Sequence, residues 1–124
     1  MGKRELALNI KRQRTNCAQA VLCAFSEETG LSQETLRKIG AGLGLGMGCM
    51  EGPCGALCAA EILLGLIRGE GRPLYPDATR VVETFREKCG STICKEIKGR
   101  DTGKVLCSCE DCVGNAAEIV ESMI

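Results

Sequence analysis

The stretch from Gly42 to Gly69, GLGLGMGCMEGPCGALCAAEILLGLIRG, constrains the fold of this chain more than any other segment. It joins a glycine-rich loop to the least polar run of the sequence. Glycine lets a backbone take positive φ or pack closely against a neighbour, so the loop is expected to lie against another part of the chain. The apolar run predicts a central helix over Cys54 to Arg68, with Pro53 suited to its first position.

Three cysteines, Cys49, Cys54 and Cys58, lie where the loop meets this helix. Cys54 falls in the first predicted turn, where free N–H groups and the positive end of the helix dipole favour a thiolate. Cys58 lies one helical step further along the same face. The segment is therefore predicted to hold a redox-active sulfur site.

The whole chain contains ten cysteines and no histidine in 124 residues. Residues Met1 to Arg14 are charged throughout and lack the apolar core of a signal peptide, so a cytoplasmic location is expected. In that compartment a cysteine-rich chain favours metal or redox chemistry over structural disulfides. Without histidine, mixed Cys/His zinc sites and histidine-ligated haem are excluded, and a metal would be held by thiolates or by thiolates with a carboxylate.

The charges balance, with 16 basic and 16 acidic residues, and Phe25, Phe85 and Tyr75 are the only aromatics. This composition gives no support for nucleic-acid binding. Glycines, Pro53 and cysteines interrupt the apolar run before it is long enough to span a membrane, so no membrane partner is expected. Aliphatic and small residues must fill the core, and a homodimer interface that completes this core is a further hypothesis.

Hydrophobic periodicity predicts an all-α fold, a small helical bundle of five to six helices with a glycine-rich loop. We expect one cysteine-rich redox domain over residues 1–124. Ser32 and Asp77 are expected to cap helices, and Gly30 to end one. The expected helical segments are Glu5–Arg14, Cys17–Glu28, Gln33–Ala41, Cys54–Arg68, Ala78–Lys88, Thr92–Lys98 (restarted after Ser91) and Asp111–Met123.

Four cysteines share a position in the first turn of a predicted helix: Cys17, Cys54, Cys94 and Cys112. Several helix N-termini together stabilise negative charge, as expected for an anionic iron–sulfur cluster or for redox thiols of low pKa. The further candidate ligands are Cys49, Cys58 and Cys89.

The other cysteines and one carboxylate carry weaker signals. The C-x-C-x2-C run of Cys107, Cys109 and Cys112 is consistent with extra ligands, a resolving thiol or an exposed loop. Cys23 is expected to be a buried apolar residue. Glu61 places a charge inside an apolar helix, and we expect an Arg or Lys from a neighbouring helix to pair with it.

Several of these segments resemble the C-GCAxxG-C-C family, which is defined by four cysteines and a Cys-Gly-Ala-x-x-Gly motif. The matching segments are Asn16-Cys17-Ala18-Gln19-Ala20-Val21, the glycine-rich loop with Cys54-Gly55-Ala56-Leu57, then Cys94 and Cys112. The resemblance runs from about Thr15 to Val120. This chain departs from the pattern in having Ala59 where the motif closes with glycine, and in having six additional cysteines.

The resemblance implies redox activity, a source among anaerobic prokaryotes and a likeness to the iron–sulfur part of a multi-centre cytochrome. Our first hypothesis is an iron–sulfur cluster-binding redox or electron-transfer protein with thiolate-only ligation and a redox partner protein. The alternatives are a thiol–disulfide redox protein in which Cys54 attacks and Cys49 or Cys58 resolves, and a structural zinc module. The sequence assigns no catalytic residue, and enzyme activity is left open.

Overall fold

The computed structural model describes residues 2–124, and every regular element within them is a helix. The prediction of an all-α fold is confirmed. Short helices such as α3 and α5 raise the number above the predicted five to six. In chain order the elements are α1 (Lys3–Lys11), α2 (Cys17–Cys23), α3 (Ser26–Thr29), α4 (Gln33–Gly40), α5 (Gly44–Met47), α6 (Gly55–Arg68), α7 (Tyr75–Cys89), α8 (Cys94–Lys98) and α9 (Cys109–Met123).

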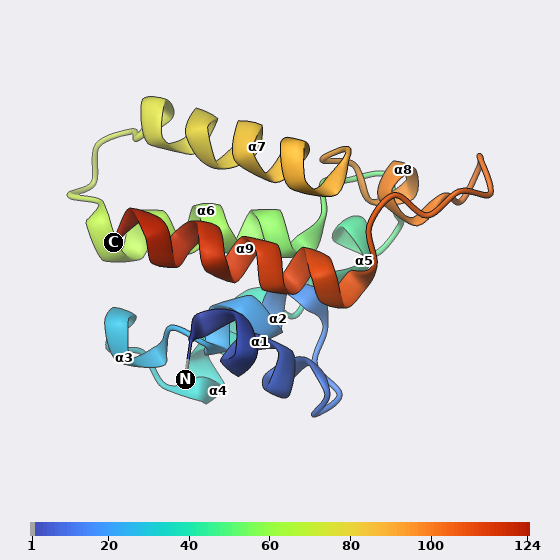
Figure 1. The fold of residues 1–124 in the computed structure, drawn as a ribbon. Helices are drawn as coiled ribbons and strands as arrows, with labels where there is room; N and C mark the ends of the chain where they lie inside the picture. Colours follow the sequence, from blue (N-terminus) through green and yellow to red (C-terminus); the bar gives the residue numbers. More distant parts are fainter. Residues whose placement is uncertain (1) are drawn as a thin grey trace.

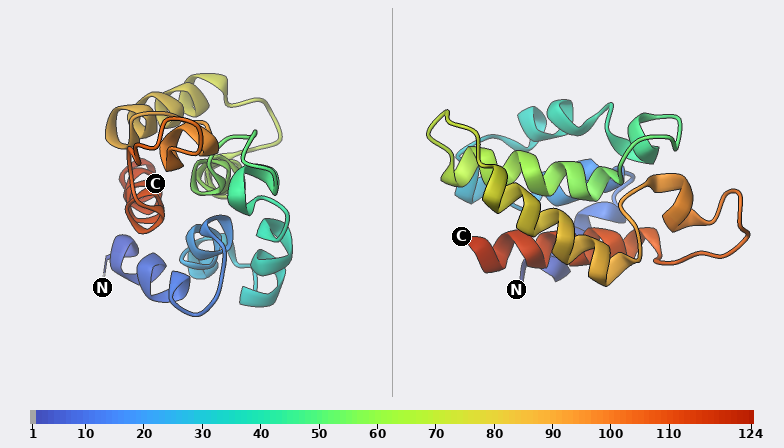
Figure 2. Two further views of the ribbon diagram at one scale, coloured as in Figure 1. Left: turned by 90° about the vertical axis from the view of Figure 1, so that its right-hand side faces the viewer. Right: turned by 90° about the horizontal axis from the view of Figure 1, so that it is seen from above.

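The long helices α6 and α9 lie side by side in the middle of the molecule (Figure 1). Helix α7 covers one side of this pair, and α1 with α2 covers the other, while α4 packs on α2 (Figure 2). The glycine-rich loop with α5, the short helix α8 and the N-terminal ends of α6 and α9 gather at one end of the bundle (Figure 1). This end carries most of the cysteines discussed below.

Small side chains allow the central helices to pack closely. Phe25 and Phe85 are the largest buried side chains, whereas Tyr75 is 74% exposed. Alanines at buried positions leave room for helix backbones to pack closely, which agrees with the scarcity of aromatics. The buried alanines of α2, α6 and α9 are Ala18, Ala20, Ala56, Ala59, Ala60, Ala116 and Ala117.

Two helix-end signals in the first half of the chain are confirmed. The Ser32 side chain accepts a hydrogen bond from the Thr35 N–H and caps α4, and Gly30 ends α3 in the left-handed conformation with φ of 73°. The predicted helix Cys17–Glu28 is wrong in one respect. Its backbone breaks at Phe25, whose φ of −114° and ψ of 29° are not helical, so two shorter helices replace one.

Other helix boundaries differ from the prediction for a physical reason. Pro53 does not begin α6, because it pairs in an isolated bridge with Ile93 and the helix starts two residues later. Helix α7 begins at Tyr75 rather than after Asp77, since Pro76 fits the first turn of a helix. Helix α9 begins at Cys109, where the Ser108 hydroxyl accepts the Asp111 N–H at 3.0 Å.

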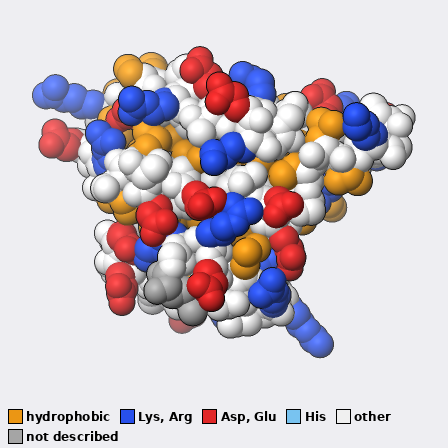
Figure 3. Space-filling view, in the orientation of Figure 1, with side chains coloured by type: hydrophobic (Ala, Val, Ile, Leu, Met, Phe, Trp, Pro, Cys, Tyr) orange, Lys and Arg blue, Asp and Glu red, His pale blue; other side chains and the backbone are white. Residues whose placement is uncertain are grey.

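The surface carries basic and acidic side chains interspersed rather than separated, as the face in Figure 3 shows. This distribution agrees with the net charge of zero. No helix in the described part of the chain combines the length and apolar character that crossing a bilayer requires.

Candidate metal centre

Two short backbone segments pair at the cysteine-rich end of the bundle. The Cys54 N–H donates to the Thr92 carbonyl at 2.8 Å, and the Cys94 N–H donates to the Gly52 carbonyl at 3.0 Å. This pairing fixes the N-terminal ends of α6 and α8 next to each other. It therefore brings together two cysteines that are 40 residues apart in the sequence.

Six of the ten cysteines line one small cavity where the N-terminal ends of α2, α6, α8 and α9 meet. The cavity volume is about 10 Å³, close to the smallest space that holds a single water molecule or an ion of that size. Gly55, Ile97 and Lys98 complete the lining. The six cysteines are Cys17, Cys54, Cys94, Cys107, Cys109 and Cys112.

Glycines let the loop and α6 approach this cavity. A Cβ on Gly46 would stand 2.4 Å from the Cys94 Cβ, and a Cβ on Gly55 would stand 2.7 Å from the Cys17 Sγ. Gly46 also has φ of 56°, and Leu45 and Met47 on either side of it take left-handed φ of 54° and 62°. Non-glycine residues in this region store strain, which is commonly found at functional sites.

Cys54 stands at the centre of the sulfur contacts. It is 7% exposed and occupies the N-cap of α6, one position before the first turn in which the sequence placed it. Hydrogen bonds from the Cys112 and Cys17 thiols and from the backbone N–H groups of Ala56 and Leu57 lower its pKa to about 4, against the effect of burial. Cys54 is therefore the sulfur best prepared to be a thiolate.

On one side of Cys54, the sulfurs of Cys89, Cys107 and Cys112 lie within 4.8 Å of one another. A hydrogen bond from Cys112, with others from Asn115 and Cys107, lowers the pKa of Cys89 to about 6. The Asn115 side-chain amide stands 3.4 Å from the Cys89 sulfur. Burial raises the pKa of Cys107 to about 11. Among these three cysteines, negative charge is therefore favoured on Cys89 and disfavoured on Cys107.

On the other side of Cys54, Cys17 contacts Cys109, and Lys98 contacts Cys109. The Lys98 ammonium lies 3.0 Å from the Cys109 sulfur. Burial lowers the pKa of Lys98, but the combined effect of Cys109, Cys94 and Cys17 raises it above its usual value, so the ammonium stays charged. The sulfurs thus form a continuous row from Cys109 through Cys17, Cys54 and Cys112 to the Cys89 and Cys107 pair.

All four cysteines of the predicted primary set are buried and line the cavity: Cys17, Cys54, Cys94 and Cys112. Cys89 is buried and contacts Cys112, although it does not line the cavity itself. Cys58 is half-buried on α6 and Cys49 is exposed on the loop, and both lie outside the lining. Cys23 is 1% exposed at the end of α2, where its thiol stands 3.7 Å from the Gln33 carbonyl.

The sequence left Cys107 and Cys109 open between extra ligands, a resolving thiol and an exposed loop, and in the structure both line the cavity. The C-x-C-x2-C run indicated this position, because Cys107 and Cys109 are close in sequence to Cys112 and therefore lie near it in the fold. The loop before α9 folds back so that the Leu106 N–H donates to the Ile97 carbonyl at 2.8 Å. This return contact could not be read from the spacing.

The donor set suits a soft metal or a metal–sulfide cluster. The cavity of about 10 Å³ has room for a single ion, so a cluster requires the cysteine-bearing segments to move apart. Buried thiolates need a compensating positive charge, and Lys98 supplies the one cation among the described residues that line the cavity. Thiolates are ligands of zinc, copper(I) and iron–sulfur clusters. Zn–S bonds of about 2.3 Å in a tetrahedron place sulfurs roughly 3.8 Å apart. The Cys89, Cys107 and Cys112 sulfurs need only a small contraction to reach that spacing.

Comparison with known proteins finds a family match over nearly the whole chain. A family model described as "Putative redox-active protein (C_GCAxxG_C_C)" matches residues 15–123. No curated protein and no solved structure matches the chain. The matched residues include every cysteine that lines the cavity.

Proposed function

Since this chain belongs to the C-GCAxxG-C-C family, we propose that it binds an iron–sulfur cluster and works as a redox or electron-transfer protein. One observation carries the proposal: six cysteines, from the N-terminal ends of α2, α6, α8 and α9 and the loop before α9, converge on one cavity in a chain without histidine. Such a cluster supplies one-electron redox chemistry, and the protein tunes its potential through hydrogen bonds to sulfur, burial and nearby charge.

We propose Cys17, Cys54, Cys94 and Cys112 as the primary ligands. The additional ligands that the contacts favour are Cys89, Cys107 and Cys109. The predicted roles of Cys49 and Cys58 stay proposals, and their position outside the lining favours a peripheral role.

The number of thiols favours a cluster over a single zinc ion. A structural zinc site is closed by four ligands. Here a row of sulfurs extends beyond four, and the N–H groups of Ala56 and Leu57 point at the Cys54 sulfur. Backbone donors to a ligand sulfur are one of the means by which proteins set cluster potentials. A second or larger cluster would use the remaining thiols.

We propose that a redox partner protein docks at the cysteine-rich end. Leu45 and Met47 of α5 and Leu106 of the loop before α9 expose apolar side chains, with exposed fractions of 50%, 56% and 44%. Exposed apolar side chains that gather into a patch mark interaction sites on soluble proteins. Contact there would place the partner against the segments that cover the cavity. A homodimer whose interface completes the core stays a separate prediction.

A thiol–disulfide function is the second candidate, favoured by the low pKa of Cys54 and its contacts with Cys17 and Cys112. All ten cysteines are free in the structure, so a neighbouring thiol is available to resolve a mixed disulfide. Against this, Cys54 is only 7% exposed, and a protein substrate would have difficulty reaching it.

Purification without oxygen, followed by iron, zinc and acid-labile sulfide analysis per chain, tests the proposal. Iron with sulfide in the wild type is expected to be lost in Cys54→Ser and Cys112→Ser. Cys23→Ala is the matched control, because Cys23 is equally buried but lies outside the cavity. Stoichiometric zinc without sulfide would favour the zinc module. Metal-free protein that reversibly loses one thiol pair on oxidation would favour disulfide chemistry.

A further inference from the structure

A second cavity, away from the cysteines, lies between the C-terminal half of α6 and the segment that leads into α7. Its volume is about 510 Å³, within the range of small-molecule sites. Leu64, Pro73 and Leu74 give it an apolar surface, and Gly65 leaves its floor open because no heavy atom lies within 4 Å of where a Cβ would stand. The cavity is therefore wide enough for an organic ligand.

Glu61 is the acidic group of this cavity, and the structure gives it no cation. The sequence predicted an Arg or Lys partner from a neighbouring helix, and this prediction is wrong for the described residues. The Oε1 atom of Glu61 is buried and accepts no hydrogen bond. A buried acceptor left without a donor costs about 1–3 kcal/mol. The other carboxylate oxygen of Glu61 is not buried in this way, and a ligand in the cavity would donate to that oxygen.

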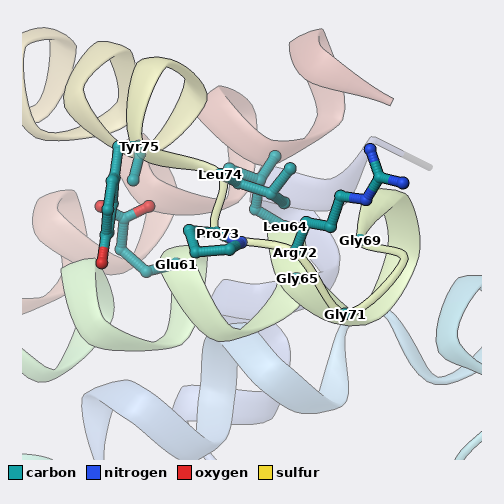
Figure 4. Close-up of a pocket in the computed structure, with 10 residues that line it drawn as sticks. Glu61, Leu64, Gly65, Gly69, Gly71, Arg72, Pro73, Leu74 and Tyr75 are labelled. Atoms are coloured by element: carbon teal, nitrogen blue, oxygen red, sulfur yellow. The ribbon is translucent and has the colours of Figure 1, made fainter.

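The neighbouring charges do not supply the missing partner. Arg72 lines the same cavity, but its side chain extends away from Glu61 (Figure 4). Arg68 is engaged with Asp77 at 3.6 Å and with the Met123 carbonyl at 2.8 Å. Burial raises the pKa of Glu61 to about 7, as expected for a carboxyl without a compensating charge.

Tyr75 stands at the same end of the cavity as Glu61, and both side chains line it (Figure 4). The ring is exposed on the molecule. A carboxylate beside an aromatic ring suits an organic cation, because the carboxylate pairs with the charge and the face of the ring attracts it. A hard divalent cation such as Ca²⁺ or Mg²⁺ is disfavoured, since it takes about six or more oxygen ligands and Glu61 is the acidic residue of the lining.

We propose that this cavity binds a small organic ammonium ion. The ammonium donates to Glu61 beside Tyr75, and its apolar body lies on Pro73 and Leu74. The site does not depend on the metal centre, so either assignment can fail without the other.

Titration of the protein with n-butylammonium chloride at pH 8 tests this assignment, followed by NMR of the Glu61 carboxyl carbon and the Tyr75 ring. The neutral 1-butanol and sodium chloride at the same ionic strength are the reference additions. A saturable shift with n-butylammonium alone is expected. Glu61→Gln should weaken binding at least tenfold, and Tyr75→Leu several-fold. The matched control is Glu70→Gln, which removes one charge from an exposed position outside the lining.

Three results would overturn the assignment. The first is a shift that stays linear up to tens of millimolar, and the second is equal binding of 1-butanol. The third is a shift of the Tyr75 signals with protein concentration alone, which would show that a second copy covers the cavity. Because Tyr75 is 74% exposed, its substitution leaves the fold intact and keeps the test decisive even if Glu61→Gln does not fold.

Discussion

Replacement of Gly46 by alanine is the sharpest test of how the glycine-rich loop builds the centre. The new Cβ would stand 2.4 Å from the Cys94 Cβ and 3.1 Å from the Gly52 carbonyl oxygen. Overpacking of this kind costs about 1–3 kcal/mol. The left-handed φ of 56° adds about 1–2 kcal/mol for a residue with a side chain. We therefore expect Gly46→Ala to reduce the free energy of unfolding by about 2–5 kcal/mol.

Gly48→Ala separates these two contributions. Gly48 also has a left-handed φ, of 83°, but no heavy atom lies within 4 Å of the point where its Cβ would stand. This variant should lose only the conformational part, about 1–2 kcal/mol. Urea unfolding followed by circular dichroism under reducing, oxygen-free conditions measures both. At roughly 4 °C per kcal/mol, the melting temperatures should differ clearly as well.

The metal content of the two variants provides an independent readout. Gly46→Ala should also lose bound metal, because it displaces Cys94, whereas Gly48→Ala should keep it. Equal stability and equal metal content in the two variants would refute the close packing of the loop on Cys94.

Three further predictions follow from the site and from Glu61. Cys54→Ser should remove most bound metal while Cys49→Ser keeps it, since Cys54 lines the cavity and Cys49 does not. The metal content per chain measures this, and equal losses in the two variants would contradict it. Lys98→Met should make the reduction potential more negative, on the order of tens of millivolts, because it removes a cation 3.0 Å from the Cys109 sulfur. A redox titration in which Lys98→Met and Lys98→Arg give the same potential would count against this. Burial raises the pKa of Glu61 from 4.5 to about 7, so the contribution of this carboxyl to the free energy of unfolding is fully present below pH 4.5 and is lost as the pH rises through 7. Glu61→Gln should therefore raise the free energy of unfolding of the unliganded protein, relative to the wild type, by more at pH 8 than at pH 4. Unfolding curves that give the same difference between variant and wild type at both pH values would refute this.

Local signals predicted the fold class well, because they depend on neighbouring residues. Ser32 and Gly30 act at their own helix ends, and the apolar stripes of α6 and α9 bury the faces that their periodicity indicated. The errors arose where contacts between distant segments determine the backbone conformation. Pro53 could have begun a helix, but pairing with Ile93 holds it in an extended conformation, and no local pattern reveals that partner.

The candidate site shows the same division. Helix-start positions pointed to Cys17, Cys54, Cys94 and Cys112, and these four do line one cavity. The loop that returns Cys107 and Cys109 to that cavity depends on contacts with α8, which spacing alone does not encode. Cys49 and Cys58 are close to Cys54 in sequence, but the direction of α6 and the exposed loop keep both out of the lining.

X-ray absorption at the iron edge of protein purified without oxygen tests the central claim most directly. An iron–sulfur cluster held only by cysteines predicts a first shell made of sulfur alone, together with an iron–iron distance. A first shell that contains nitrogen or oxygen, or the absence of iron from protein that carries stoichiometric zinc, would contradict thiolate-only iron–sulfur ligation.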